Sequence, residues 1–545
     1  MTSGAADAEG MASKEFPGLN AIVRVFSSSA RRRAKFRKSW GRAGEADGWL
    51  ASRLFALRRE GNPRTLDDKT WRDLELAAFF RELDTTVTRP GSQYLYKQLR
   101  TYEFDADASA QRYATYRLLV TNAPQREELQ LALAGLQTDS AAYIVDVLFG
   151  PPALNLGHPR LLYAWALCCV ASIALVVISS LGLWVLAVIL FVNAVVLYRI
   201  SPRLRRDTEA LIQGRRLLAV ADRLGSVAFY DSIPQLAVLH AERRKRTRLR
   251  KDLRWLTLLS DTSTPWGGLP VVVNWFCLAW LVAYSRAVRR FTASRHEWAS
   301  TFELVASVDA AIAVASFLHR TPVHCRATIT NEAKIAVRDG YHPLIARPVP
   351  NSLVLTHRSA LVTGSNMSGK TTYVKMVGIN IILGHTLGFC LATSATIPAS
   401  LVMASVRSDQ SVESGKSAYL AEVEAIGKFV GRAAVGECRG FIIDEPFSGT
   451  NTVERTAVTK AVLDAISAHG QVLATTHDLE LQHLLADRFD FFYFREDPTV
   501  EGFFDFKVHP GTSNERNAIR VLERMGFPSE IVSAASSIVG KMPKA

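Results

Sequence analysis

The sequence predicts an α/β domain with a phosphate-binding loop over residues 346–545, preceded by an all-α region that contains a transmembrane helical hairpin. Residues 364–372 form a glycine-rich phosphate-binding motif between an apolar run and a helical pattern. Two further apolar runs follow this motif, one ending in two carboxylates and one ending in a histidine. Residues 161–198 carry no charged side chain, and this run is too long for one membrane span and about right for two.

The composition is that of a large folded protein with a basic excess. Its 545 residues suggest three or four domains, at a prior of about 150 residues each. Hydrophobic residues make up 48% and charged residues 21%, which excludes a wholly disordered chain. Six cysteines without a C-x-x-C pair argue against a disulfide framework and against a zinc module. The net charge of +14 favours an anionic partner, either nucleic acid or an anionic membrane surface.

Charge and apolar patterning divide the chain into five segments. We expect a basic, flexible tail, a helical region, a hydrophobic hairpin, a basic helical region and the α/β domain, over 1–45, 46–158, 159–200, 201–345 and 346–545. Most of the basic excess lies in residues 199–261, which hold 15 basic and 7 acidic side chains. Residues 346–545 hold 19 and 20 and are close to neutral, so the net charge says little about the α/β domain.

The basic tail contains a dense run at residues 31–38. Two interpretations are open for this run: contact with acidic lipid headgroups, or a solvated and disordered tail. The first 30 residues lack the continuous apolar stretch of a secretory signal, so no signal peptide is expected.

The hairpin prediction rests on residues 161–198 and their flanks. Residues 179–182 read Ser-Ser-Leu-Gly and offer a turn in the middle of the run. Arginines flank both ends, at Arg160 and from Arg199 onwards, and positive flanks place both ends on the cytoplasmic side. We therefore expect two transmembrane helices in the cytoplasmic (inner) membrane, with the α/β domain and both flanks in the cytoplasm. The alternative is a buried helical hairpin in a large soluble protein.

A second uncharged run covers residues 262–285. Its length would permit a span, but Gly267, Gly268, Pro270 and Asn274 weaken a helix there. A third span would also separate the two ends of the chain or place the basic segment outside. The sequence therefore favours a buried, re-entrant or interfacial segment.

A basic cluster lies between these two apolar runs. It consists of Arg243, Arg244, Lys245, Arg246, Arg248, Arg250 and Lys251. The functional interpretation is contact with phosphate, of DNA or of lipid. A merely solvated helix face is the competing interpretation.

The phosphate-binding loop reads G-x-x-x-x-G-K-T and starts at Gly364. Glycines at 364 and 369 allow backbone N–H groups to converge on phosphates, and the following helix adds its positive N-terminus. Lys370 is expected to neutralise the β- and γ-phosphates of ATP, and the hydroxyl of Thr371 to ligate Mg²⁺. The remaining nucleotide-binding candidates in the loop are Ser365, Asn366, Met367, Ser368, Gly369 and Thr372.

The two apolar runs after the loop supply the catalytic candidates. Residues 440–443 are apolar and lead into Asp444 and Glu445. Asp444 is expected to hold Mg²⁺ and Glu445 to orient or activate the attacking water. Residues 471–476 form a second such run and lead into His477, which is expected to sense the γ-phosphate.

These motifs together resemble the MutS family of DNA mismatch repair ATPases. Residues 364–372 read G-S-N-M-S-G-K-T-T, close to the family's G-P-N-M-[SA]-G-K-S-T. Residues 444–451 read D-E-P-F-S-G-T-N and parallel its D-E-x-x-x-G-T-[SN], and residues 474–477 parallel its A-T-H strand end. Upstream, residues 340–344 resemble the G-R-H-P that opens the ATPase domain, and residues 414–422 resemble its S-G-x-S-T-F-x-x-E.

The resemblance implies an ABC-type ATPase that uses ATP and Mg²⁺ and no other small-molecule substrate. Two such domains would form a homodimer head to tail, with Ser417 of each subunit reaching the nucleotide of the other. The C-terminus, with Phe527-Pro528, would support this dimer. DNA would be a partner, and membrane lipid would be a second one because of the hairpin.

A weaker likeness covers the region before the ATPase domain. Residues 73–76 and 83–88, with Gly91 and Leu95, resemble the start of the family's helical core, and residues 307–309 resemble its returning lever helix. Mismatch-reading members carry a Phe-x-Glu motif in an N-terminal domain, and this motif has no match here. The stretch of about 65 residues before the helical core is too short to hold that N-terminal domain. We therefore expect an ATP-dependent, membrane-anchored DNA-binding protein that does not itself read mismatches.

Two alternative functions remain open. A transporter-like ABC machine shares the loop, the Asp-Glu pair and the histidine, but it requires an L-S-G-G-Q-like motif where this chain has Ser414-Gly-Lys-Ser417. It also requires many spans. A membrane scaffold with a regulatory ATPase and no DNA contact is the other alternative, because the basic cluster could bind lipid.

Overall fold

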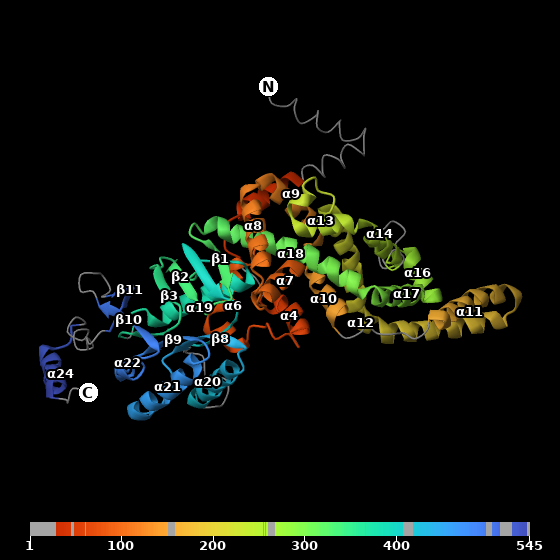
Figure 1. Cartoon of the computed structure of the whole chain (residues 1–545). Helices are drawn as coiled ribbons and strands as arrows, with labels where there is room; N and C mark the ends of the chain where they lie inside the picture. The colour runs from red at the N-terminus through yellow and green to blue at the C-terminus, as the bar shows by residue number, and fades with distance from the viewer. Residues whose placement is uncertain are drawn as a thin grey trace, which may run out of the picture. The chain divides into compact units, whose positions relative to one another are not determined.

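The computed structural model of the chain describes residues 29–44, 48–59, 61–150, 159–253, 256, 258–259, 268–365, 367–406, 418–496, 504–512 and 526–541. The chain forms two compact units. A helical unit takes residues 1–60, 83–97 and 115–320, and an α/β unit takes residues 61–82, 98–114 and 321–545. Figure 1 colours both units along the chain.

The helical unit is built from helices that the sequence predicts by composition rather than by sharp motifs. Besides a helix over residues 29–39, its α-helices in the described part of the chain are α3 (Gly48–Ala51), α4 (Arg53–Arg58), most of α7 (Arg89–Leu99), the C-terminal part of α8 (Ala106–Thr121), α9 (Ala123–Leu133), α10 (Ile144–Phe149), α11 (Pro159–Ile178), α12 (Leu181–Leu224), α13 (Pro234–Ala241), α14 (Arg243–Asp252), α16 (Gly268–Cys277), α17 (Ala279–Ala293) and α18 (Arg295–Arg320). Short 3₁₀ helices lie at Ala134–Leu136, Asp139–Tyr143 and Tyr230–Ser232.

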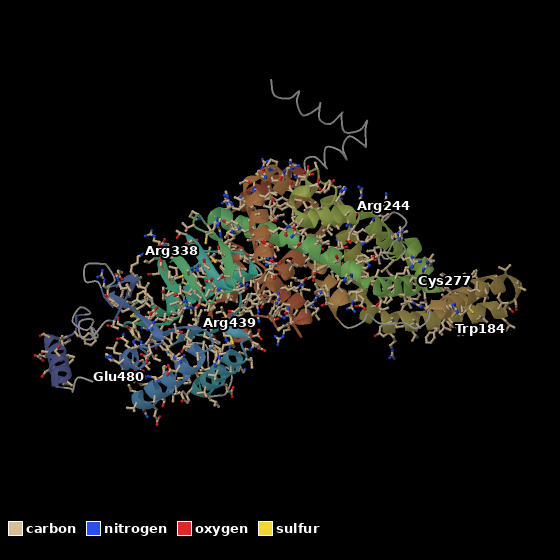
Figure 2. The ribbon with its side chains drawn as sticks, viewed as in Figure 1. Trp184, Arg244, Cys277, Arg338, Arg439 and Glu480 are labelled. Carbon is tan, nitrogen blue, oxygen red and sulfur yellow. The ribbon has the colours of Figure 1, made fainter. Side chains whose placement is uncertain are left out.

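Helices α11 and α12 form a helical hairpin. The two helices pack against each other along the apolar run, and the chain turns at Ser179-Ser180, as the sequence predicts. Figure 1 shows the hairpin extending from the other helices of its unit, and Figure 2 labels Trp184 close to the turn. Leu181–Ile200 is the apolar part of α12, and the helix continues to Leu224 without a break. Most large apolar side chains of this hairpin point away from the protein interior, as with Phe191, which is 69% exposed.

Three helices in the described part of the chain are long and apolar enough to cross a membrane. They are Arg160–Ile178, Leu181–Ile200 and Arg295–Arg320. Only 11% and 17% of the first two lie buried inside the protein, whereas 78% of the third does. A bent pair, Ala123–Leu136 with Asp139–Phe149, would count as a fourth only if it were one broken span. Helix α18 is therefore the central core helix of the helical unit.

The N-terminus of α7 is tied to α18 by one buried carboxylate. Asp309 accepts hydrogen bonds from the backbone N–H groups of Val87 and Thr88, at 2.9 and 2.8 Å, and from the Thr88 hydroxyl at 2.6 Å. A Cβ atom at Gly91 would lie 2.2 Å from this carboxylate, so only glycine fits there. The two short motifs that resemble the MutS core and lever thus meet in space. Burial raises the pKa of Asp309 to about 7.

The basic run near the N-terminus differs from the flexible, disordered tail predicted for it, whereas contact with lipid headgroups stays a prediction. Residues 29–39 form a helix rather than a flexible or disordered tail. Phe36 is buried, and Arg37 makes a double ion pair with Glu127 of α9, at 2.6 and 2.9 Å. The guanidinium of Arg126 also lies 3.5 Å from the ring centroid of Trp40. A short basic helix and a solvated basic tail have similar sequences. The burial of the Phe36 side chain is what makes this run a packed helix.

The basic cluster at residues 243–251 lies on α14, and one member was assigned wrongly. Arg246 is 1% exposed, because its guanidinium donates to Asp222 at 2.9 Å and to the carbonyl oxygen of Leu239. It therefore supports the fold and offers no charge to a partner. Arg250 is partly exposed and pairs with the other oxygen of Asp222 at 3.0 Å. Among the described side chains of α14, the exposed basic ones are Arg243, Arg244, Lys245, Arg248 and Arg250, and Figure 2 labels Arg244.

The α/β unit contains two sheets and the remaining helices. Its strands are β1 (Cys325–Thr330), β2 (Ile335–Gly340), β3 (Asn351–Leu355), β4 (Ser359–Thr363), β5 (Phe389–Cys390), β6 (Ser394–Pro398), β7 (Leu401–Ser405), β8 (Cys438–Asp444), β9 (Gln471–Thr476), β10 (Phe489–Glu496) and β11 (Phe504–Pro510). Its helices are α5 (Asp68–Asp73), α6 (Leu76–Leu83), α19 (Lys370–Thr386), α20 (Ala418–Ala434), α21 (Thr452–Ser467), α22 (Glu480–Leu484) and α24 (Ser529–Lys541).

The six-stranded sheet has the order β11-β10-β4-β9-β8-β7. All its pairs are parallel except β10–β11. Every residue of β4 and β9 is buried, as is typical of central strands in a parallel sheet. The five-stranded sheet has the order β3-β2-β6-β1-β5 and is mostly antiparallel. Helix α19 contacts strands of both sheets and is almost entirely buried.

The unit boundaries differ from the segments predicted from the sequence. Strands β1 and β2 precede residue 346, and residues 61–82 and 98–114 join the α/β unit instead of the helical one. Tertiary hydrogen bonds account for this. The Thr70 hydroxyl and the Asp73 carboxylate accept from the backbone N–H groups of Ala404 and Val406, both at 2.9 Å, along the edge strand β7. The N-terminal segment thereby satisfies backbone groups that a sheet edge would leave open.

Candidate active site

The loop between β4 and α19 starts and ends with glycines in conformations that other residues avoid. Gly364 has φ +151° and Gly369 has φ +103°, and Met367 also has a positive φ of 69°. A Cβ atom at Gly364 would lie 3.1 Å from the Phe494 carbonyl oxygen of strand β10. The glycines of the sequence motif are thus required by the backbone path that brings the loop to the N-terminus of α19.

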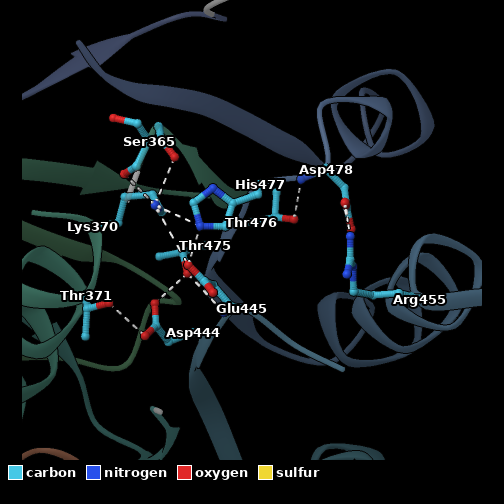
Figure 3. A network of polar contacts seen from close by, with 11 residues as sticks. Ser365, Lys370, Thr371, Asp444, Glu445, Arg455, Thr475, Thr476, His477 and Asp478 are labelled. Atoms are coloured by element: carbon cyan, nitrogen blue, oxygen red, sulfur yellow. Dashed lines mark hydrogen bonds and ion pairs between the residues drawn. The ribbon is translucent and has the colours of Figure 1, made fainter. Parts of the chain in front are cut away.

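Lys370 is the first residue of α19 and reaches back over the loop. Its Nζ donates to the carbonyl oxygens of Gly364 and Ser365, both at 2.9 Å (Figure 3). The same Nζ lies 3.4 Å from Nε2 of His477 and 3.8 Å from Oε1 of Glu445. Burial lowers the pKa of Lys370, and the two nearby carboxylates, Glu445 and Asp444, oppose that shift. A buried cation with only carbonyl oxygens and partial ion pairing around it is suited to an anionic ligand.

Two hydroxyl groups of the loop are buried without a hydrogen-bond partner within the described residues. They are the Oγ atoms of Ser365 and Ser368. A buried polar atom without a partner carries a desolvation cost, and ligand sites are where such atoms are found. Thr372 is exposed on the first turn of α19, and Asn366 lies outside the described residues.

A carboxylate and two hydroxyls lie side by side at the end of strands β8 and β9. Oδ2 of Asp444 accepts from the Thr371 hydroxyl at 2.9 Å, and Oδ1 accepts from the Thr475 hydroxyl at 2.6 Å. Asp444 is buried, and β8 and β9 run parallel with Asp444 opposite Thr475. Carboxylate and hydroxyl oxygens are ligands that Mg²⁺ prefers, and the pair Thr371 and Asp444 fits one ion between them.

Glu445 points toward the loop and the histidine. Its Oε1 lies 2.6 Å from Nε2 of His477 (Figure 3). The backbone of Glu445 has a positive φ of 49°, and its N–H donates to the hydroxyl and carbonyl oxygens of Thr475, at 3.0 and 3.2 Å. A left-handed backbone at a residue with a Cβ is a local strain that the neighbouring hydrogen bonds maintain. The strain places the carboxylate beside the phosphate-binding loop.

The residue after the histidine is fixed by an ion pair. Asp478 is buried and receives Nη2 and Nε of Arg455 on its two oxygens, at 2.5 and 2.8 Å. Arg455 lies on α21, which begins after the Gly449-Thr450-Asn451 segment, and Asn451 caps that helix by accepting from the Glu454 N–H at 2.9 Å. The pair therefore connects the segment after Glu445 to the segment that carries His477.

A cavity of about 360 Å³ adjoins the loop. Residues of the loop and α19 line it together with residues from upstream of β3, and they include His342, Arg347, Asn351, Met367, Lys370, Thr371, Tyr373, Met376, Glu445 and Phe506. Burial lowers the pKa of His342 to about 4, so this imidazole is neutral near pH 7. The neutral ring accepts from the Leu344 N–H at 3.3 Å. Apolar side chains and a neutral imidazole beside a phosphate-binding loop suit a nucleobase and ribose.

The structure brings the predicted catalytic and loop residues to one place. Lys370, Thr371, Asp444, Glu445 and His477 come from three segments that lie far apart in the chain, and they form the network drawn in Figure 3. Ser417, predicted to act on a second subunit, lies outside the described residues.

Sequence reasoning missed several residues of this site. Thr475 was seen only as part of a strand end, yet its hydroxyl bonds both Asp444 and Glu445. Arg455 and Phe506 were not singled out. No local signal identifies Thr475, because its role depends on the pairing of β8 with β9, which places Asp444 opposite Thr475.

Comparison with known proteins agrees with this geometry. Residues 360–543 match the family model of MutS domain V. The chain is 28% identical over 276 residues to the DNA mismatch repair protein MutS of Natronomonas pharaonis, covering 46% of this chain and 31% of that protein. It is 27% identical over 215 residues to MutS of Thermus thermophilus, and 28% identical over 221 residues to MutS of Aquifex pyrophilus, in each case covering 38% of this chain and 26% of the relative.

The chain therefore spans about a third or less of the length of these curated relatives. The matched family model covers the loop, the two carboxylates and the histidine. These matches support the MutS family and confirm the resemblance inferred from the motifs.

Proposed function

We propose that this protein is a membrane-anchored ATPase of the MutS type that couples ATP hydrolysis to contact with DNA. The observation that carries the ATPase part is the network of Lys370, Thr371, Asp444, Glu445 and His477, three of which, Lys370, Thr371 and Glu445, line one cavity. Such a set combines a phosphate cradle, a magnesium ligand pair and a carboxylate placed to act on water. Support from the MutS family adds the expectation of a dimer and of DNA.

The loop residues fit the triphosphate of ATP. The unpartnered hydroxyls of Ser365 and Ser368 and the N-terminus of α19 would donate to phosphate oxygens. Lys370 would exchange its bonds to two loop carbonyls for the β- and γ-phosphates. Lys370→Ala is expected to abolish nucleotide binding, measured with a fluorescent ATP analogue. Unchanged affinity would contradict this assignment.

Thr371 and Asp444 fit a magnesium ion. When bound, Mg²⁺ would neutralise charge that develops on the β- and γ-phosphate oxygens. Thr475 keeps the Asp444 carboxylate in place through its 2.6 Å hydrogen bond. The Thr371 hydroxyl and the Asp444 carboxylate would then hold the ion through their oxygen atoms.

Glu445 is proposed to take a proton from the attacking water. The attack would break the bond between the γ-phosphorus and the bridging oxygen, giving ADP and phosphate, and His477 would contact the γ-phosphate. Glu445→Gln should bind ATP and slow turnover by about a hundredfold or more. Glu480→Gln is the matched control, because Glu480 is exposed on α22 and outside the network (labelled in Figure 2). Equal turnover in wild type and Glu445→Gln would refute the role.

A head-to-tail homodimer through the ATPase domains is part of the proposal. Ser417 of each subunit would complete the site of the other, as the likeness of residues 414–422 to the MutS pattern implies. Ser417→Ala should lower the ATPase rate, and mixing it with the Lys370→Ala variant should restore activity to one of the two sites. Activity that stays independent of protein concentration and of mixing would refute a composite site.

Membrane anchoring is supported by the hairpin α11–α12. Two adjacent apolar helices of 19 and 20 residues suit the thickness of a bilayer, and their large side chains are mostly exposed. Arginines at both ends favour the cytoplasmic side for both flanks, hence the cytoplasmic (inner) membrane. Deleting residues 161–198 should release the protein from the membrane fraction without loss of nucleotide binding. A deletion variant that stays in the membrane fraction would contradict anchoring by the hairpin.

DNA is the proposed macromolecular partner, and mismatch reading is not part of the proposal. The exposed basic residues Arg243, Arg244, Lys245 and Arg248 offer a phosphate contact, whereas Arg246 does not. Binding of homoduplex, mismatched and branched DNA by the solubilised protein should fall steeply with salt. Absence of binding to all three would discard DNA and favour a membrane scaffold with a regulatory ATPase.

A further inference from the structure

One polar side chain is enclosed within the apolar hairpin. Asn193 of α12 is 0% exposed, although the apolar residues around it on the same helix are largely exposed, such as Phe191 and Val195 at 69% and 43%. Its carboxamide is fully engaged. Nδ2 donates to the carbonyl oxygens of Phe276 and Trp275, at 2.8 and 3.0 Å, and Oδ1 accepts from the indole N–H of Trp165 at 2.8 Å.

The two carbonyl groups that Asn193 binds belong to a break between helices. Helix α16 ends at Cys277 and α17 begins at Ala279, and Leu278 between them has a left-handed backbone, with φ 50° and ψ 35°. The end of α16 leaves carbonyl groups without partners in the helix. Asn193 satisfies two of these from outside, and Asn274 Oδ1 accepts from the Trp280 N–H at 3.1 Å on the other side of the break.

Helix α16 packs against both helices of the hairpin, and its outer face is apolar. It contacts α11 and α12, and Figure 2 labels Cys277 at the end of α16. Val272 and Trp275 are each 50% exposed and Val273 is 36% exposed. Exposed apolar side chains on α16 therefore continue the exposed apolar surface of the hairpin.

The depth of this contact can be estimated along α12. Asn193 lies seven residues before Ile200, the last residue of the apolar stretch, and this separation corresponds to about 10 Å along a helix. The break after α16 is therefore level with the hydrocarbon part of the hairpin and not with its charged flank. Interrupted helices at such depth are tolerated only where their open backbone groups find partners.

We infer that α16 enters the bilayer beside the hairpin as a half-inserted third segment, and that Asn193 holds it there by bonding the carbonyl groups at its end. This inference rests on the proposed membrane anchoring. The occupant of the outer face of α16 is the acyl-chain region of lipid. The membrane part of the protein is then a three-segment unit, and α17 leads the chain back toward the helical unit, where the Tyr284 hydroxyl donates to Asp207 at 2.9 Å.

Lipid photo-crosslinking of the full-length protein in vesicles of phosphatidylethanolamine and phosphatidylglycerol tests this inference. The photoreactive amino acid p-benzoylphenylalanine would replace Val273 on α16, Val188 on α12 or Val458 on α21, one at a time. Val188 is 61% exposed and reports on the hairpin, and Val458 is 39% exposed and reports on the α/β unit. Mass spectrometry would detect lipid adducts.

We expect lipid adducts at Val188 and Val273 and none at Val458. Adducts at Val188 without adducts at Val273 would overturn the insertion of α16 and leave the membrane anchor intact. Absence of adducts at both positions would overturn the proposed membrane anchoring as well. The two proposals thus fail in different ways.

A pair of variants tests the role of Asn193. Asn193→Leu keeps a similar volume but removes both N–H donors to α16. The yield of lipid adducts at position 273 should therefore fall about threefold or more, because one average interhelical hydrogen bond contributes a factor of about three. Trp165→Phe is the matched control, because it removes only the bond to Oδ1 and leaves both donors in place. Retained adducts at Val188 and retained ATP binding would show that the variants are folded and inserted. Equal yields at Val273 in wild type and Asn193→Leu would refute the role of Asn193.

Discussion

Helix α18 and the hairpin helices α11 and α12 are all long and apolar enough to cross a membrane, but their surroundings are opposite. In α18, 78% of the apolar stretch is buried in the protein, whereas only 11% and 17% of the hairpin segments are. Phe302 on α18 is fully buried, whereas Phe191 on α12 is 69% exposed. The comparison teaches that an apolar helix of this length does not by itself indicate a membrane span. What surrounds its side chains decides between a core helix and a membrane helix.

A polar residue in each of the two regions sharpens the contrast. In α18 the carboxylate of Asp309 is buried and bonds the backbone at the start of α7. In the hairpin the carboxamide of Asn193 is buried and bonds the backbone at the end of α16. Each region thus uses one enclosed polar group to fix a neighbouring segment, but a titratable carboxylate is used only in the protein core. If the hairpin lies in lipid, as proposed above, a neutral amide avoids the larger cost of a charge there.

The largest expected difference between the two regions comes from truncating a matched pair of phenylalanines. Phe302→Ala should destabilise the helical unit by about 3–5 kcal/mol, because a fully buried side chain leaves a cavity. Phe191→Ala should change stability by less than about 0.5 kcal/mol in detergent, because its ring faces the outside. The midpoint of thermal unfolding measures both. Similar shifts for the two variants would remove the distinction between α18 and α12.

A charged side chain introduced into the hairpin should show whether lipid or water surrounds the hairpin. Val188→Arg puts a charge near the middle of Leu181–Ile200, which should cost about 2.5–3.5 kcal/mol of insertion free energy. The variant should therefore shift from the membrane fraction toward the soluble or degraded fraction. Val458→Arg on α21 is the matched control at an exposed position and should leave fractionation unchanged. Full membrane retention of Val188→Arg would argue for a water-facing hairpin.

The carboxylate of Asp309 predicts how the helical core responds to pH. Its pKa is raised to about 7 by burial, above the ordinary value of 3.8, so the folded state keeps a proton that the unfolded state has released between these values. The stability of the helical unit should therefore fall as pH rises from about 4 to 7. Burial also raises the pKa of Asp84, which adds in the same direction.

Asp309→Asn should reduce this dependence and should itself cost about 1–3 kcal/mol, because an amide N–H₂ can face backbone N–H donors. The midpoints of thermal unfolding across pH 4–7 measure how the stability of the helical unit changes with pH. Asp139→Asn is the matched control, because the Asp139 side chain is 84% exposed on the same unit. A slope unchanged by Asp309→Asn would contradict the assignment.

The α/β unit should show the opposite dependence on pH. Burial lowers the pKa of both His342 and His385 to about 4, from an ordinary value of 6.5. These neutral histidines contribute stability that is present above about pH 6.5 and is lost as pH falls toward 4. His385→Phe should reduce the loss, since the ring already packs edge-on against Tyr102 and Phe104. Hydrogen exchange in α19, corrected for the intrinsic exchange rate at each pH, measures the stability of the α/β unit. As pH falls, protection should decrease in α19 and increase in α18.

Much of the candidate site could be predicted because its residues are constrained by local geometry. Gly364, Gly369 and Lys370 follow from a loop that must turn tightly and present donors, and a run of apolar residues before Asp444 indicates a buried strand. The role of Thr475 could not be read in this way. It depends on β8 and β9 being neighbours in register, which is a long-range pairing.

The basic residues show the same limit. Residues 31–38 and 243–251 look alike as charge runs, yet the structure makes one a packed helix held by Arg37 and Glu127 and buries Arg246 in the other. Counting charges cannot separate a residue that pairs inside the protein from one that faces solvent. The ion-pair partners Glu127 and Asp222 are about 90 and 24 residues away along the chain.

The sequence by itself determined the phosphate-binding loop, the strands that lead into Asp444 and His477, the likeness to MutS and the position of the hairpin, because each depends on residues close together in the chain. The tertiary structure alone decided that Thr475 joins Asp444 to Glu445, that residues 61–82 belong with the α/β unit, that α18 is core and the hairpin is not, and that Asn193 bonds the end of α16. These features depend on which groups far apart in the chain become neighbours. Hydropathy and spacing carry no information on that choice, whereas burial and hydrogen-bond partners do.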